Sequence, residues 1–163
     1  MYPLYNTALA LAAPAGAAWL RLHPRYKPLR ARFDPPVPPC AEPPLWLHAC
    51  SVGEVGTARP ILAALHERMP ETPLLLTVST LSGREQAEKT IADPIAWFPF
   101  DTRRAVQRFL ERARPRVLVL IETELWPNVL RETRRYGAPS LVINARLSET
   151  HYARYHRWRA LFR

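Results

Sequence analysis

The stretch "LWLHACSVGEVGTARPILAAL", residues 45–65, contains an abrupt change of pattern. Its first six residues are nearly all apolar, which is typical of a short strand buried on both faces of a parallel sheet. Apolar residues then return at helical spacing, on a stripe that comprises Ala58, Ile61, Leu62, Leu65 and Met69. The carboxylate of Glu54 therefore lies at a predicted strand-to-helix turn.

Four more strand-like runs follow along the chain. They cover residues 74–79, 96–99, 117–121 and 141–144. Amphipathic segments separate them, and "RRYGAP" at 134–139 supplies a glycine helix stop followed by proline. Alternating strands and helices predict an α/β fold with a doubly wound, Rossmann-like parallel sheet over residues 45–163. Ligands of such sheets bind at the carboxyl ends of the strands.

Two acidic loops follow predicted strands and meet at this edge. Glu54 follows the first strand, and Glu122 and Glu124 follow the fourth. An acid at a helix start complements the helix dipole, and this is one interpretation of all three glutamates. The other interpretation is that one of them serves as a catalytic base, because neighbouring carboxylates raise each other's proton affinity.

Small and polar residues of the same loops are candidate substrate contacts. Gly53 and Gly83 would allow close approach of a bulky ligand and leave amide donors free near helix starts. Polar contacts could come from Ser51, Ser82, Asn144, Arg146 and Ser148. Turn and capping roles explain the same residues equally well. We expect Trp126 to pack, and His48 to be a core histidine with its hydrogen bonds satisfied.

The composition favours an anionic partner. The chain has 163 residues and 23 Lys and Arg against 14 Asp and Glu, a formal charge of +9. Its arginines are dispersed with no aromatic-rich basic motif, which argues against a nucleic-acid binder. Cys40 and Cys50 lack metal-ligand spacing and indicate a reducing compartment.

The N-terminal part differs in composition from the rest. Residues 2–20 carry no charge, and a basic flank follows that comprises Arg21, Arg25, Lys27, Arg30 and Arg32. A signal peptide would have its charges first. We predict that residues 1–32 form a membrane anchor, spanning or interfacial, together with its basic flank. The flank would lie on the cytoplasmic side. A buried helix of a soluble domain is the alternative. Six prolines in residues 33–44 predict a semi-rigid linker outside the core.

Five motifs in order carry a resemblance. They are "HACSVGEV", "STLSGREQAE", "PFDTRRAVQRFL", "IETELWPN" and "INARLSE". Together they resemble the N-terminal domain of the bacterial 3-deoxy-D-manno-octulosonic acid (Kdo) transferases, from the anchor region to the last residue.

This resemblance implies the N-terminal half of a GT-B glycosyltransferase that is inverting and needs neither a metal nor another cofactor. The family moves Kdo from CMP-Kdo to the lipid A precursor, lipid IVA, at the cytoplasmic face of the inner membrane. The family's general base aligns with Glu54. Our own hypothesis is that Glu122 or Glu124 raises the proton affinity of Glu54.

The resemblance also sets an expectation about what the chain lacks. Family members are about 400 residues long, and their C-terminal domain holds CMP-Kdo. We expect this chain to carry the acceptor side without that donor domain, and to be inactive alone. The alternatives are a split-enzyme subunit that pairs with a separate donor domain, and a non-catalytic membrane module that binds lipid or sugar.

Overall fold

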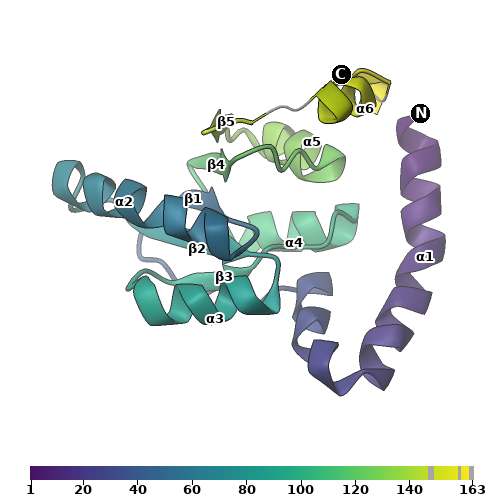
Figure 1. Ribbon diagram of the computed structural model, residues 1–163, viewed down its shortest axis with the longest axis horizontal. Helices are drawn as coiled ribbons and strands as arrows, with labels where there is room; N and C mark the ends of the chain where they lie inside the picture. The colour runs from purple at the N-terminus through teal and green to yellow at the C-terminus, as the bar shows by residue number, and fades with distance from the viewer. Residues whose placement is uncertain (147–148, 158, 162–163) are drawn as a thin grey trace.

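The fold centres on five parallel strands in the order β3-β2-β1-β4-β5 (Figure 1). The computed structural model describes residues 1–146, 149–157 and 159–161. The strands are β1 (Leu45–His48), β2 (Leu74–Val78), β3 (Ile95–Trp97), β4 (Val117–Ile121) and β5 (Ser140–Ile143). The helices of the domain are α2 (Val52–Arg68), α3 (Leu81–Thr90), α4 (Arg103–Ala113), α5 (Pro127–Tyr136), α6 (Glu149–Arg157) and the short η2 (Arg159–Leu161). All five predicted strands are confirmed, with ends shifted by at most two residues.

Helices cover both faces of the sheet, as in a doubly wound domain. On one face α4 and α5 pack over Trp46, Phe98 and Leu118. On the other, α2 and α3 pack over Leu47 and Leu76. The chain runs outward from β1 through β2 to β3 and then returns to the other side of β1 with β4. This reversal of strand order lies at the carboxyl ends of β1 and β4, the place where ligands of such sheets bind.

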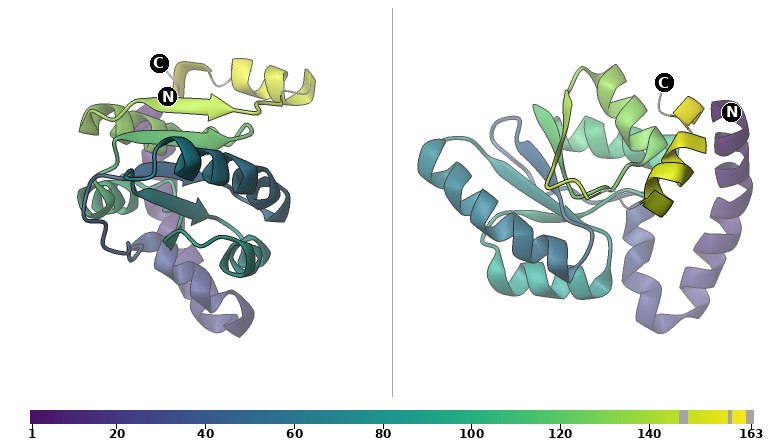
Figure 2. Two further views of the ribbon diagram at one scale, coloured as in Figure 1. Left: turned by 90° about the vertical axis from the view of Figure 1, so that its left-hand side faces the viewer. Right: turned by 45° about the horizontal axis from the view of Figure 1, so that its top comes forward.

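The first 33 residues form an N-terminal arm made of α1 (Tyr2–Leu22) and η1 (Pro24–Phe33). α1 stands beside the α/β domain rather than on its sheet, as Figure 1 and the right-hand view of Figure 2 show. Tyr2 and Tyr5 join it to the domain, because their hydroxyls donate to the side chains of Asn128 and Asp101. Among the described residues, every helix is too short or too polar to cross a bilayer.

The proline-rich segment between the arm and β1 contains no helix or strand, but it is not detached from the core. Pro35 is buried, and its carbonyl accepts a hydrogen bond of 2.8 Å from Arg112 of α4. Val37 packs against the cluster under α4 and α5. We expected a spacer outside the core, but apolar side chains of the segment extend that core instead.

Asp101 caps the start of α5 from a different element. Trp126 stands at the N-cap position and offers no capping side chain. Both carboxylate oxygens of Asp101 take this role, since they accept from the amides of Asn128 (3.1 Å) and Val129 (2.8 Å). Tyr5 of the arm donates to the same carboxylate at 2.6 Å. The arm and the start of α5 are therefore held by one buried acid.

Candidate functional site

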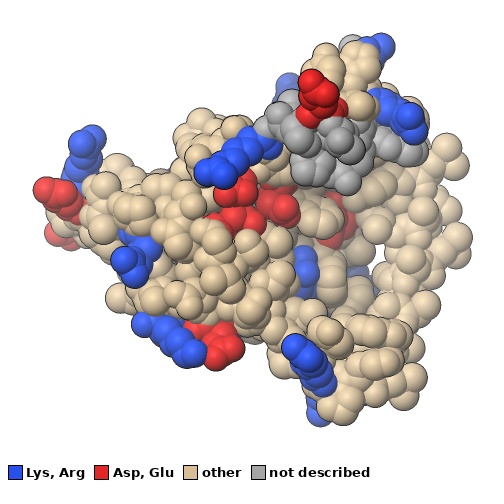
Figure 3. All heavy atoms as spheres, in the orientation of Figure 1, with Lys and Arg blue, Asp and Glu red and all other residues tan. Residues whose placement is uncertain are grey.

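Glu54 follows β1, at the point where the strand order reverses, and lies in the first turn of α2. Figure 3 shows acidic side chains gathered near the middle of this face. Glu54 is 7% exposed. Its Oε2 accepts from the amide of Cys50 at 2.7 Å, and its Oε1 accepts from the hydroxyl of Ser51 at 3.0 Å. These bonds help to cap the helix and fix the carboxylate, while lone pairs remain for a substrate hydroxyl.

The environment makes Glu54 a stronger base than a surface glutamate. Burial is the largest cause and raises its pKa, because the charged form loses solvation. The hydrogen bonds from Cys50 and Ser51 act in the opposite direction. The charges of Glu124 and then Glu122 raise the pKa further, in the direction that our sequence hypothesis requires.

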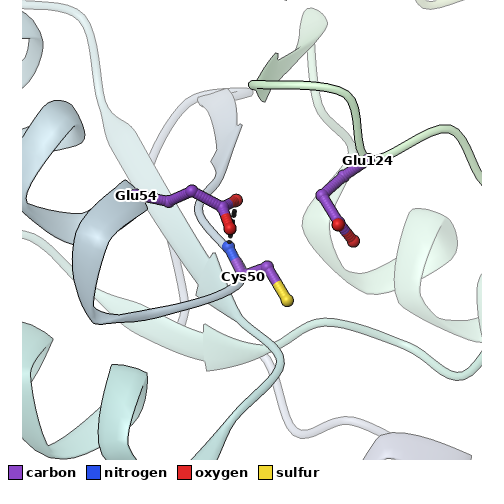
Figure 4. Close-up of side chains that lie close together, drawn as sticks. All are labelled: Cys50, Glu54 and Glu124. Carbon is purple, nitrogen blue, oxygen red and sulfur yellow. Dashed lines mark hydrogen bonds between the residues drawn. The ribbon is translucent and has the colours of Figure 1, made fainter. Parts of the chain in front are cut away.

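Glu124 reaches the same point from the loop after β4. Figure 4 shows Glu54 and Glu124 on either side of Cys50, and one possible ligand atom of each of the three residues lies within 4.8 Å of the others. Trp126 donates its indole N–H to Glu124 at 3.0 Å and packs against the core, as predicted. The predicted convergence of the two acidic loops is thus present in the fold.

The same three residues could form a metal site by distance alone. Their chemistry is less suitable, since burial raises the pKa of the Cys50 thiol to about 12. A neutral thiol is a poor ligand. Two carboxylates then remain, and the oxygens of Glu54 already accept hydrogen bonds.

Loop geometry around Glu122 holds the acidic loop in place. Glu122 adopts a left-handed φ of 64°, which is uncommon for a residue with a side chain. Its amide donates to the carbonyl of Ile143 at 2.9 Å. The hydroxyl of Thr123 donates to the carbonyl of Arg146 at 2.6 Å, so the loops after β4 and β5 are tied together.

The predicted contact residues divide into two groups. Ser51 touches Glu54, and Gly53 is exposed beside it with open space where a Cβ would stand. Ser82 is exposed in the first turn of α3, Asn144 and Arg146 are exposed in the loop after β5, and Ser148 lies outside the described residues.

The prediction of a free amide at Gly83 was wrong. Gly83 is buried, and its amide donates to the hydroxyl of Thr80. A Cβ at Gly83 would stand 2.9 Å from the carbonyl of Cys50. The glycine therefore permits α3 to pack under the turn that carries Glu54.

His48 and Arg32 are features of this edge that the sequence did not identify as functional. His48 is fully buried and its Nδ1 lies 3.0 Å from the carbonyl of Thr77, but its Nε2 has no partner among the described residues. We predicted a histidine with both ring nitrogens hydrogen-bonded, but among the described residues only Nδ1 has a partner. Burial lowers its pKa to about 3 and keeps the ring neutral. Arg32 comes from the basic flank, which we assigned only to the membrane.

Comparison with known proteins agrees with this arrangement. A model of the family described as 3-deoxy-D-manno-octulosonic-acid transferase (kdotransferase) matches residues 21–163. The 3-deoxy-D-manno-octulosonic acid transferase of Bordetella pertussis is 39% identical over 145 residues, which cover 84% of this chain and 32% of that protein. The Haemophilus influenzae transferase is 33% identical over 68% of this chain and 26% of its own length.

A plant relative extends the match. The probable mitochondrial 3-deoxy-D-manno-octulosonic acid transferase of Arabidopsis thaliana is 28% identical over 95% of this chain and 36% of its own length. The chain thus spans about a third of the length of these curated relatives. The resemblance carried by the five motifs is confirmed, and the chain belongs to the 3-deoxy-D-manno-octulosonic acid transferase family.

Proposed function

We propose that this chain forms the acceptor side of a Kdo transferase, with Glu54 as the general base. One observation carries the proposal: a buried, doubly hydrogen-bonded glutamate with a raised pKa lies where the sheet reverses. The acceptor is the lipid A precursor, lipid IVA, and the donor is CMP-Kdo bound by a C-terminal domain. The test is transfer from CMP-Kdo to lipid IVA by this chain joined to the C-terminal two thirds of the Bordetella relative.

The proposed chemistry needs no metal. Glu54 takes the proton from the acceptor hydroxyl as that oxygen attacks the anomeric carbon of Kdo. The bond to the CMP phosphate breaks on the opposite face, so the anomeric configuration inverts and CMP leaves with the bonding electrons. Donor and base must be held together for this step, and so we expect no transfer by the chain alone.

We also propose that the N-terminal arm lies on the cytoplasmic face of the inner membrane. Leu4, Leu11 and Leu22 are each more than 70% exposed, and their spacing places them on one side of α1. A basic flank follows them. Apolar side chains buried at the lipid boundary and cations beside anionic headgroups together favour interfacial binding.

The double variant L4E/L11E is expected to bind anionic vesicles at least about tenfold more weakly than the wild type, because two exposed leucines lose apolar burial. Co-flotation with phosphatidylglycerol vesicles measures this. The matched control M69E/Y136E adds the same charge at two exposed apolar residues outside the arm. Equal losses in both variants would show that the arm has no special role.

The neighbouring carboxylates give a second test. In the joined protein, the variant E122Q/E124Q is expected to lower the pKa of Glu54, because both charges raise it. The acid limb of kcat/KM then moves to lower pH. The control E85Q/E88Q removes two charges from exposed positions on α3. An unchanged pH profile of kcat/KM in E122Q/E124Q would contradict the hypothesis that these two acids raise the pKa of Glu54.

A further inference from the structure

Arg32, at the end of η1, reaches the carboxyl ends of β2 and β3. Its Nε donates to the carbonyl of Phe98 at 2.9 Å, and its Nη1 donates to the carbonyl of Ser79 at 3.1 Å. The guanidinium carbon lies 4.4 Å from the centre of the Phe100 ring. The side chain is therefore fixed at the edge of the sheet that carries the site, although its residue belongs to the arm.

The charge of Glu124 acts on Arg32, but no carboxylate of the described residues lies within ion-pair distance of it. Among the described residues, none forms an ion pair with it, and its Nη2 donates no hydrogen bond to any of them. Burial lowers its pKa to about 10, so it stays cationic at neutral pH. Even partly buried charges are normally paired, because an unpaired one loses solvation without compensation.

The neighbours of Arg32 are residues of the candidate site. Its charge acts on Cys50 and Glu124, and also on His48, whose Nε2 lacks a partner among the described residues. With Glu54 and Glu122 nearby, the site is otherwise acidic. An anionic substrate would be repelled there unless a cation offsets the carboxylates.

We infer that Arg32 is an anion-binding residue of this site and contacts a carboxylate or phosphate of the substrate. Its two backbone bonds hold the guanidinium ready, and the free Nη2 remains for the anion. The inference rests on the proposed function for the identity of the substrate. The anion is either the carboxylate of the transferred sugar or a phosphate of the acceptor.

Two matched probe pairs separate these sources. Free Kdo is compared with its neutral methyl ester, and N-acetylglucosamine 1-phosphate with N-acetylglucosamine, by calorimetric titration of this chain. We expect one anion to bind about ten- to a hundredfold more tightly than its neutral counterpart, as a charged hydrogen bond provides. R32Q should remove that preference and R32K should retain part of it. R30Q is the control, since Arg30 makes no side-chain hydrogen bond or ion pair with a described residue.

A second measurement uses the wild-type protein and therefore tests the inference even if R32Q does not fold. The Nε–H resonance of Arg32, assigned by its absence in R32K, is expected to shift when the preferred anion is added to the wild type. Equal binding within both probe pairs, an unmoved resonance at saturation, or unchanged affinity in folded R32Q would each overturn the inference. Arg32-dependent binding without transfer in the joined protein would refute the proposed function and leave the anion site standing.

Discussion

Glu54→Gln lowers Kdo transfer by about 10²- to 10⁴-fold in the joined protein, if Glu54 is the base, because that is the usual contribution of a positioned base. The amide cannot take the proton from the acceptor hydroxyl. It can still accept from the amide of Cys50, which bonds Glu54 at 2.7 Å, so the turn before α2 should stay folded. The rate of the chemical step is measured under single-turnover conditions.

The matched control for this variant is Glu85→Gln, which removes an exposed carboxylate paired with Lys89 on α3. Its rate should equal that of the wild type. Transfer within a few fold of wild type in folded E54Q would contradict the assignment. A large loss in E124Q together with activity in E54Q would move the base to Glu124, whose carboxylate lies within 4.8 Å of the same point.

The second large effect concerns stability and Asp101. Burial is the main cause that raises the pKa of Asp101 from 3.8 to about 6, against the hydrogen bonds from Tyr5, Asn128 and Val129. The folded state therefore binds more protons than the unfolded state between about pH 4 and 6, and stability falls as the pH rises through this window. The difference in pKa corresponds to about 3 kcal/mol.

Asp101→Asn removes this titration. The free energy of unfolding of the wild type minus that of D101N is expected to fall by about 2 kcal/mol between pH 4 and 7, the part of the total that this range covers, as measured by urea denaturation. Asp34→Asn is the control, and its effect on stability should change with pH in the opposite direction. The reason is that the hydrogen bond from Arg112 holds the pKa of exposed Asp34 below its usual value. The stabilisation from Asp34 is lost as the pH falls. A constant difference between wild type and D101N would contradict the account of Asp101.

Local pattern was sufficient to predict the sheet. Each strand is a short apolar run, and the run at 117–121 matches β4 residue for residue. The meeting of Glu54 with Glu124 was also predictable, because parallel strands bring their carboxyl ends to one edge. These inferences need only periodicity and the rules of strand order.

Contacts between distant residues could not be predicted in this way. Tyr5 and Asp101 are 96 positions apart, and nothing in the uncharged pattern of residues 2–20 indicates that two tyrosines donate hydrogen bonds to Asp101 and Asn128. Arg32 was grouped with the basic flank by its position in the sequence. Its contacts with the carbonyls of Ser79 and Phe98 depend on how η1 packs against the ends of β2 and β3.

The most direct test of the central claim is the structure of the joined protein with an acceptor analogue bound. The account predicts that the acceptor hydroxyl lies about 2.6–3.2 Å from a carboxylate oxygen of Glu54, beside the carboxyl ends of β1 and β4. An acceptor hydroxyl beyond the reach of Glu54, or one bound away from these strand ends, would contradict it.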